Sequence, residues 1–240
     1  MKGVRLFVVM ISAWLTACAT EIKVTDPRTG IEYIVPGKYR DIPGIQELSK
    51  LCAETSGEVI HQVANADGYF DKHKETCEMS CWDQIAFSPF QYLEIKVQDP
   101  NAYDFIKEPG IWKIYKTSID NPKCNQEIKG FMQTRKIYKN FSNKECLAIK
   151  KMSEPESEFS RSYIGKTIGL NNELSSEIFK QTQVIKNLHT DEVIANQIYF
   201  SLYPKHSKLN PGLGIGCASI GIKKTKGTFL IDVLKTKEGK

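Results

Sequence analysis

The sequence predicts an α+β fold, mostly antiparallel sheet with two or three short helices and up to three disulfides. Several short stretches alternate apolar and polar residues, which is the pattern of half-buried strands. These stretches follow one another without regular strand–helix alternation, and such an order favours antiparallel pairing over a doubly wound parallel sheet. An even set of six cysteines lies beyond the N-terminal segment, which is typical of an exported, cross-linked domain.

The composition is that of a folded globular protein. The chain has 240 residues, of which 41% are hydrophobic and 25% charged, which excludes collagen-like, low-complexity and wholly disordered classes. The formal net charge of +5, from 33 basic and 28 acidic residues, is too small to indicate a nucleic-acid-binding protein. We therefore expect no nucleic-acid partner.

The N-terminus carries the parts of a secretory leader. Lys2 and Arg5 form a short basic start, and residues 6–15 are uncharged and mostly apolar. A run of ten residues is too short to span a bilayer as a helix, which needs roughly 20 apolar residues. The run therefore fits the hydrophobic region of a signal peptide.

The end of this leader reads Leu15-Thr16-Ala17-Cys18, which resembles the lipobox of bacterial lipoproteins. The resemblance implies that residues 1–17 are removed and that Cys18 is acylated, for example with palmitate. Residues 18–240 would then form a single exported domain that contacts the membrane through its lipid. Residue 19 is alanine and not aspartate, which in this class implies the outer membrane, on its periplasmic side. The alternative is an ordinary secretory signal followed by a chance cysteine.

The other cysteines predict disulfides, because an exported location is oxidising. Six cysteines allow 15 pairings, among which the sequence does not choose. We favour Cys124 with Cys146, which would leave the other four to share two further bonds. The six disulfide candidates are Cys52, Cys77, Cys81, Cys124, Cys146 and Cys217.

One segment has the spacing of a metal site. His73, Cys77 and Cys81 recur every four residues, so on a helix they would share one face. Two thiolates and an imidazole suit zinc or copper. However, the common zinc spacing places two residues between the cysteines, and here there are three. The alternative is that Cys77 and Cys81 are two half-cystines of one structured loop, and we expect no bound cofactor.

In the first half of the chain the pattern predicts one clear hairpin and one clear helix. Residues 21–25 and 31–35 alternate around a Pro/Gly turn and predict the hairpin. Asp41 is expected to cap a helix with Pro43 in its first turn, ending at Ser56-Gly57. We also expect strands at 58–63 and 92–97, a loop or short helix at 67–82, and one or two helical turns after Asp99.

In the second half the pattern favours sheet. Ser142 and Glu145 form a capping box, which predicts a helix ending near Met152. The stretch 153–160 reads as a loop and a possible internal boundary. We expect strands at 111–117, 131–138, 178–186, 192–203, 218–222 and 229–233, followed by a frayed tail at 235–240.

Four aromatic residues cluster just after Cys81, namely Trp82, Phe87, Phe90 and Tyr92. Aromatic side chains dominate binding interfaces, so the cluster is a candidate binding groove. The alternative is that these rings form core beside a disulfide.

No catalytic motif is apparent in the sequence. It has no Gly-x-Ser-x-Gly elbow, no His-Glu-x-x-His and no phosphate-binding Gly-Lys-Ser/Thr loop. We therefore expect a binding or structural role in the envelope, with an envelope protein as one possible partner. The alternatives are a wall or lipid hydrolase with unrecognised residues, and a metal-handling protein that uses the His73 cluster.

A second resemblance covers about 25 residues. The segments 51–54, 56–61 and 68–71 are similar to small uncharacterised lipoproteins of bacteria and phages. That group implies the lipoprotein class and carries no activity with it.

Overall fold

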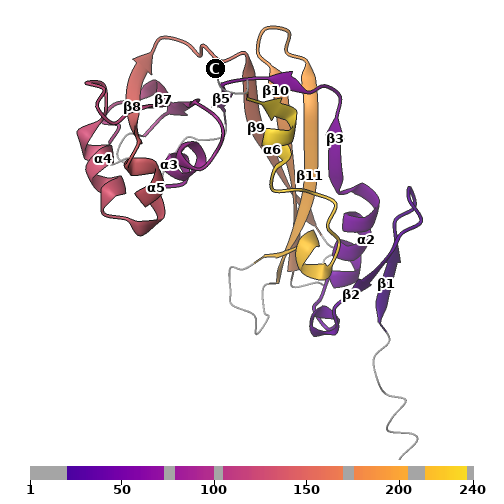
Figure 1. Ribbon diagram of the computed structural model, residues 1–240. Coiled ribbons are helices and arrows are strands. Elements are labelled where there is room, and N and C mark those ends of the chain that lie inside the picture. Colours follow the sequence, from indigo (N-terminus) through magenta and orange to yellow (C-terminus); the bar gives the residue numbers. More distant parts are fainter. Residues whose placement is uncertain (1–20, 73–78, 100–104, 170–175, 205–213, 237–240) are drawn as a thin grey trace, which may run out of the picture. The chain divides into compact units, whose positions relative to one another are not determined.

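The computed structural model describes residues 21–72, 79–99, 105–169, 176–204 and 214–236 (Figure 1). The fold class is α+β with mostly antiparallel strand pairs, as predicted. Cys18, His73 and Cys77 lie outside the described residues, as does the helical turn expected after Asp99. Within the described ranges, no helix combines the length and the apolar character needed to cross a bilayer.

The chain forms two compact units. The first comprises residues 1–56, 166–180 and 199–224, and the second comprises 57–165, 181–198 and 225–240. The stretch 153–160 therefore belongs wholly to the second unit. The strands of the largest sheet are hydrogen-bonded in the order β12-β11-β10-β9-β5-β6-β7-β8, with β3 also paired to β11.

The predicted N-terminal hairpin is present in the first unit. Strands β1 (Ile22–Thr25) and β2 (Glu32–Val35) pair antiparallel, with Ile22 opposite Val35. The short helix η1 (Gly37–Tyr39) follows, and then helix α2 (Ile45–Thr55), which contacts β1 (Figure 1). The alternation of apolar and polar residues thus predicted both the strands and their pairing.

Helix α2 exists where the sequence predicted it, but its cap is different. Gly44 occupies the N-cap position with φ 87°, and the helix has no side-chain cap, so the prediction that Asp41 caps it is wrong. A positive φ is strained for residues with a Cβ and costs glycine nothing, so Gly44 turns the chain into the helix. The helix buries one face at helical spacing, comprising Ile45, Leu48, Ser49, Cys52 and Ala53.

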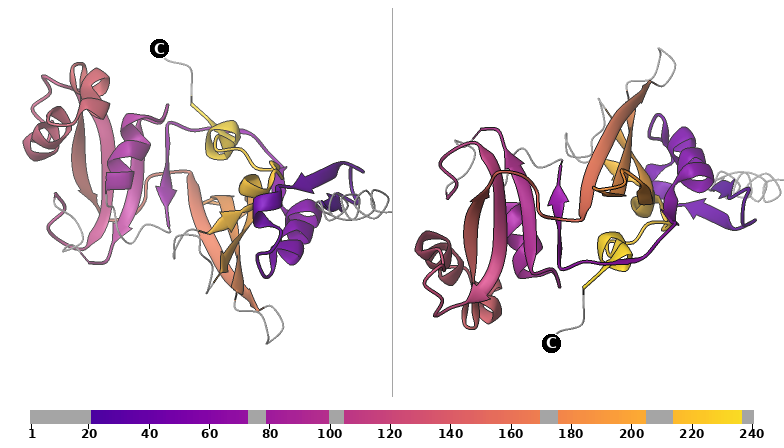
Figure 2. Two further views of the ribbon diagram at one scale, coloured as in Figure 1. Left: turned by 90° about the horizontal axis from the view of Figure 1, so that it is seen from below. Right: turned by 90° about the horizontal axis from the view of Figure 1, so that it is seen from above.

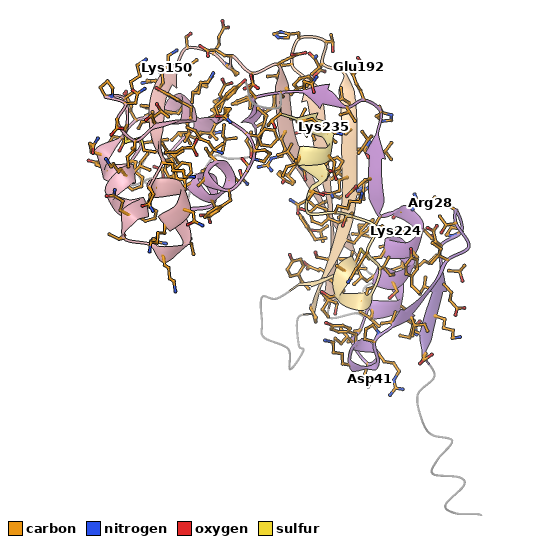
Figure 3. All side chains as sticks on the ribbon, in the orientation of Figure 1. Arg28, Asp41, Lys150, Glu192, Lys224 and Lys235 are labelled. Carbon is orange, nitrogen blue, oxygen red and sulfur yellow. A yellow bond between two sulfur atoms is a disulfide. The ribbon has the colours of Figure 1, made fainter. Side chains whose placement is uncertain are left out.

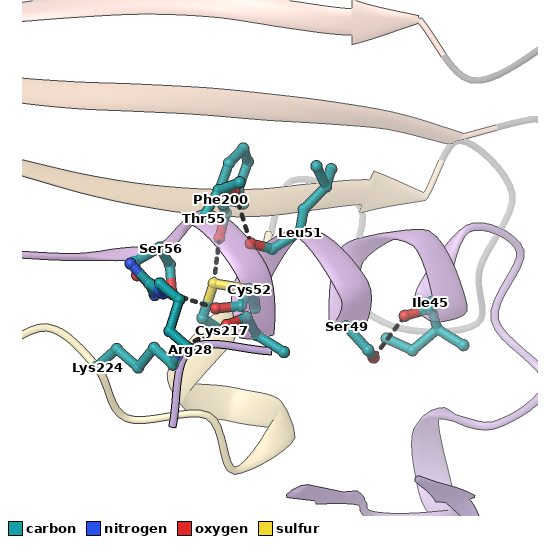
Figure 4. The surroundings of a disulfide bond; sticks show 11 residues. Arg28, Ile45, Ser49, Leu51, Cys52, Thr55, Ser56, Phe200, Cys217 and Lys224 are labelled. Carbon is teal, nitrogen blue, oxygen red and sulfur yellow. Dashed lines mark hydrogen bonds between the residues drawn. A yellow bond between two sulfur atoms is a disulfide. The ribbon is translucent and has the colours of Figure 1, made fainter. Parts of the chain in front are cut away.

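A disulfide fixes helix α2 within the first unit. Cys52 is bonded to Cys217, with Cα atoms 5.5 Å apart (Figure 4). Cys217 begins the short helix η4 (Cys217–Ile220), directly after strand β12 (Ile215–Gly216). The bond therefore joins segments that are 165 residues apart in the chain.

Beside this disulfide, a buried aspartate joins three more segments. Asp26 in the hairpin turn is 1% exposed and accepts hydrogen bonds from the Lys224 ammonium and from the Arg28 backbone amide. Lys224 also donates to the carbonyl of Ala53, and Arg28 Nη2 donates to the carbonyl of Ser56 at 3.1 Å. The Arg28 and Lys224 side chains are labelled in Figure 3. The two cations thus tie the hairpin turn to the last turn of α2.

The second unit contains a mixed sheet. Strand β5 (Gly68–Asp71) is buried at all four positions and runs parallel to β6 (Tyr92–Val97). Strands β6, β7 (Gly110–Ser118) and β8 (Glu145–Met152) follow in antiparallel order. The loop or short helix predicted for 67–82 therefore contains a buried strand before helix α3 (Met79–Ala86).

Helices α3, α4 (Gln126–Gln133) and α5 (Lys139–Ser142) belong to this second unit and gather around strands β6 to β8 (Figure 2). They share one hydrophobic core with the strands, to which Trp82, Leu93, Ile114, Ile128 and Leu147 each contribute a buried side chain. Cys124 is bonded to Cys146 in this unit, with Cα atoms 5.8 Å apart, which confirms the predicted pairing.

Two predictions around this disulfide are wrong. The strand predicted for 131–138 is replaced by α4 and the short helix η3 (Lys136–Tyr138). The Asn125 side chain accepts a hydrogen bond from the Ile128 amide at 3.0 Å and caps α4. The helix predicted behind Ser142 is instead strand β8, paired along its length with β7. Pairing with a neighbouring strand buries Cys146, Leu147 and Ala148 and outweighs the local capping pattern.

The prediction of a C-terminal strand pair is also wrong. Residues 217–220 form η4, which ends at Gly221 with φ 86°, and helix α6 (Phe229–Val233) takes the place of the second strand. Phe229 and Val233 are four residues apart, and both are buried on the inner face of α6. Strand β13 (Leu234–Lys235) then pairs in parallel with β4 (Ala64–Asn65), so part of the expected frayed tail is ordered.

The long hairpin strands agree with their predictions. Strand β10 (Ser176–Asn187) extends its predicted range by two residues at its start and one at its end, and β11 (Val193–Pro204) is shifted by one residue from its predicted range. Strand β9 (Phe159–Gly169) lies next to β10. Strand β3 (Gly57–Ile60) pairs antiparallel with β11, with Ala195 opposite Ile60.

A buried carboxylate secures the loop before β9. Glu94 on β6 is 0% exposed, and its Oε2 accepts from the Ser157 hydroxyl at 2.7 Å and from the amides of Glu156 and Ser157. Lys113 Nζ lies 3.5 Å from Glu94 Oε1 and 2.8 Å from Glu156 Oε2. Lys150 Nζ also lies 3.5 Å from Glu156 Oε1. Two ammonium groups therefore match the two carboxylates, and the cluster fixes the loop.

We predict that the Cys52–Cys217 and Cys124–Cys146 disulfides differ in their contribution to stability. On the chain-entropy model, the 165-residue separation of Cys52 and Cys217 stabilises by about 5 kcal/mol, and the 22-residue separation of Cys124 and Cys146 by about 3 kcal/mol. All four cysteines are buried, so paired alanine substitutions leave comparable cavities. Urea unfolding of the two double-alanine variants under non-reducing conditions measures both losses, and an equal or reversed order would contradict the model.

We also predict that Asp26 makes stability depend on acid pH. The hydrogen bond from Lys224 outweighs the opposing effect of burial and holds the pKa of Asp26 well below its usual range. A depressed folded-state pKa stabilises the fold at neutral pH, and this stabilisation is lost as the pH falls below about 4. The Tm of the parent protein should therefore exceed that of Asp26→Asn by a constant amount above about pH 5 and approach it as the pH falls from about 4 to 2. Glu32→Gln, an exposed change in the same hairpin, is the control.

Candidate functional site

A pocket of about 300 Å³ opens in the second unit. Its walls come from strand β5, helix α3 with the turn after it, strand β9, and the segment that leads into and through helix α6. The lining residues are Tyr69, Asp83, Gln84, Phe87, Ser88, Phe90, Arg161, Gly227, Leu230 and Ile231. Both apolar and charged side chains are present, which is the usual character of a ligand site.

Arg161, which lines this pocket, belongs to a buried ion pair. Asp71 and Arg161 lie directly opposite each other on the parallel strands β5 and β9. Asp71 is 0% exposed and Arg161 is 6% exposed. Both Nε and Nη2 of Arg161 donate to Oδ2 of Asp71, with the Nε bond at 3.2 Å. The strand register therefore places a guanidinium deep in the unit together with its counter-ion.

Two tyrosines and a glutamine hold the guanidinium in place. It lies 5.1 Å from the ring centre of Tyr69 and 5.3 Å from that of Tyr163. Nη2 also donates to Gln84 Oε1 at 3.1 Å. Among the described residues, Nη1 makes no hydrogen bond, so Arg161 retains donors for a ligand that enters the pocket it lines.

The charge of Arg161 is secure at any physiological pH. Burial disfavours the charged form, but the charge and the hydrogen bonds of the Asp71 carboxylate outweigh it and raise the pKa of the guanidinium. Burial raises the pKa of the Tyr69 hydroxyl, which therefore stays protonated. The wall consequently presents a permanent cation whose charge is balanced by Asp71 directly behind it.

Besides the guanidinium, the pocket is lined by an acidic and an aromatic side chain, those of Asp83 and Phe87. Asp83 on α3 is half-buried and accepts a hydrogen bond from the Tyr138 hydroxyl. Phe87 stacks on Tyr138 with ring centres 5.4 Å apart and planes 3° apart. Phe87 is nevertheless 56% exposed, so part of its ring is open to solvent.

Two further hollows lie in the first unit and differ in kind. One, of about 520 Å³, is lined by the consecutive residues 40–47, and the other, of about 570 Å³, lies between β1 and α2. Neither is lined by a buried charged side chain. They are surface concavities without an organised polar group, so the arginine pocket is the candidate site.

The sequence-predicted site residues stand apart from this pocket. Cys52, Cys217, Cys124 and Cys146 are disulfide-bonded. Cys81 on α3 is buried and also disulfide-bonded, so it does not supply the thiolate that the zinc or copper hypothesis requires. Across the described ranges, no three His, Cys, Asp or Glu side chains are grouped so as to hold a metal ion.

The sequence left open whether the aromatic cluster after Cys81 lines a binding groove or forms core, and its members divide between the two. Trp82 and Phe90 are buried in the core, at 3% and 1% exposure. Phe87 faces the pocket and is the exposed member. Asp71 and Arg161 were missed, because they are 90 residues apart in the chain and only the pairing of β5 with β9 brings them together.

Known proteins offer no guide to this site. No family model matches the chain, and no curated protein or solved structure is similar to it.

We predict strong coupling between Asp71 and Arg161. Removing one partner of a buried ion pair strands the other charge, which costs about 3–5 kcal/mol. Asp71→Asn and Arg161→Met should each lower the free energy of unfolding by about that amount. The double variant should lose much less than the two losses added together, because no charge is then left unpaired. Urea unfolding of the parent protein and the three variants gives the free energies for a double-mutant cycle. A loss in the double variant equal to the sum of the two single losses would contradict the pairing.

Proposed function

We propose that this chain is a lipid-anchored protein of the bacterial outer membrane that acts by binding a ligand or partner on the periplasmic side. The anchor would be Cys18, after cleavage of residues 1–17, as the lipobox resemblance implies. Two or three acyl chains make such attachment stable, since each buried methylene contributes about 0.8 kcal/mol.

Two features support an exported and anchored chain. The Cys52–Cys217 and Cys124–Cys146 bonds suit an oxidising compartment. The first strand begins at Ile22, so its Cα lies at most about 14 Å from that of Cys18. An acylated Cys18 would therefore hold the hairpin close to the bilayer surface, without a long tether.

The observation that carries the binding role is the arginine pocket. Its guanidinium is fixed in advance by Asp71, Gln84 and two tyrosine rings, so no side-chain entropy is lost when a ligand engages it. The neighbouring Phe87 offers exposed aromatic surface of the kind that anchors ligands. Preorganised donors beside exposed apolar surface are what recognition requires.

We predict that lipid attachment depends on Cys18. Cells grown with an alkyne analogue of palmitate should label the parent protein and leave Cys18→Ser unlabelled, while the conservative Thr16→Ser stays labelled. The parent protein should also remain in the membrane fraction after a high-salt wash. Equal labelling of Cys18→Ser would refute the anchor, as would membrane release of the parent protein by salt alone.

Residue 19 tests the choice of membrane. In the class that the leader resembles, aspartate at this position retains a lipoprotein in the inner membrane. Ala19→Asp should therefore shift the protein from the outer-membrane to the inner-membrane fraction of a sucrose gradient, whereas Ala19→Ser should not. An unchanged distribution of Ala19→Asp would contradict the proposed sorting.

A further inference from the structure

We propose that the arginine pocket binds an organic cation carried on a short apolar chain, such as an aliphatic amine or the amino terminus of a peptide. This inference rests on the proposed binding role and names its ligand class. It does not depend on the lipid anchor.

The charge balance of the pocket favours a cation. The Arg161 guanidinium is paired with Asp71 through two hydrogen bonds, so their charges cancel at short range. Asp83 also lines the pocket, and its hydrogen-bonding partner is the neutral hydroxyl of Tyr138. Burial keeps that hydroxyl neutral, because it raises the pKa of Tyr138. The group therefore carries one net negative charge, located on Asp83.

The aromatic wall beside Asp83 strengthens this preference. Asp83 and Phe87 lie one helical turn apart, where the Phe87 amide donates to the Asp83 carbonyl at 3.0 Å. A cation that contacts the Asp83 carboxylate is therefore close to the Phe87 ring, whose face attracts positive charge. The cation Arg135 lies 4.3 Å from the ring centre of Phe131 and is not among the lining residues.

The remaining walls define what the cation is attached to. Leu230 and Ile231 contribute apolar surface, and Ile231 is 38% exposed. A volume of about 300 Å³ accommodates a short branched chain and is at the lower limit for ligand sites. Arg161 Nη1 is available to donate to a carbonyl oxygen next to the amine. A peptide amino terminus with an apolar first residue supplies all three ligand groups: the cationic amine, the apolar chain and the carbonyl oxygen.

Three small molecules with one carbon skeleton test the charge preference. They are 3-methylbutylamine, 3-methylbutanol and 3-methylbutanoate, which at pH 7 are cationic, neutral and anionic. Titration calorimetry of the purified full-length protein should give the tightest binding for the amine and no saturable binding for the carboxylate. Leucinamide adds a carbonyl oxygen beside the amine. Tighter binding of leucinamide identifies a peptide terminus as the source, and equal binding identifies a free amine.

Substitutions assign the binding to this pocket. Asp83→Asn keeps the acceptor for Tyr138 and removes the charge, so it should weaken amine binding about tenfold or more and leave the alcohol unchanged within about twofold. Asp120→Asn, an exposed change elsewhere in this unit, is its control. Phe87→Ala should weaken both the amine and the alcohol, and the amine more because the ring face attracts its charge. Ile137→Ala, a more exposed apolar residue outside the lining, should weaken neither.

Three outcomes would overturn the inference. Binding of 3-methylbutanoate as tight as that of the amine would make Arg161 the dominant charge; the binding role would then stand and the cation preference would fail. Unchanged amine binding in Asp83→Asn, with the thermal unfolding of the parent retained, would remove the proposed contact. Absence of saturable amine binding to the folded parent would reject the pocket, while fatty-acid labelling at Cys18 separately decides the anchor.

Discussion

The pairing of Asp71 with Arg161 is the constraint on which the candidate site depends. A fully buried carboxylate is tolerated only when a cation and hydrogen bonds compensate for lost water. Here the compensation comes from a residue 90 positions away, placed directly opposite by the parallel register of β5 and β9. Because Asp71 holds the guanidinium from behind, Gln84 and the two tyrosine rings can complete its environment and leave one terminal nitrogen for the pocket.

Three of the protein's carboxylates differ in whether a nearby cation balances their charge. Asp26 is held by Lys224, and Glu94 is held by Lys113 and by two backbone amides. These carboxylates serve the fold, because their charge is already matched. Asp83 is hydrogen-bonded to a tyrosine hydroxyl that brings no charge. Among the described residues Asp83 forms no ion pair, so its charge is available to the cationic ligand that we propose for the pocket it lines.

Local pattern and tertiary structure agree where one face of an element is buried. The hairpin at β1 and β2, helix α2, and strands β6, β7, β10 and β11 all follow their apolar periodicity. The predictions are wrong where short-range signals compete. The capping pattern at Ser142 is overridden by pairing of β8 with β7, and the β-forming residues after Asn125 are drawn into a capped helix. In both places a neighbouring strand or cap, not intrinsic propensity, decides the state.

The sequence by itself determined the fold class, the globular character and the even set of cysteines, and it carries the lipobox-like pattern at residues 15–18, because each depends on composition or on residues close together in the chain. It also singled out Phe87 as one of four aromatics that could line a groove. Only the tertiary structure decided that Cys52 pairs with Cys217, that Asp71 faces Arg161, and that Phe87 and not Trp82 is exposed. Such contacts join residues far apart in the chain. Strand register and packing create them, so no local sequence pattern predicts them.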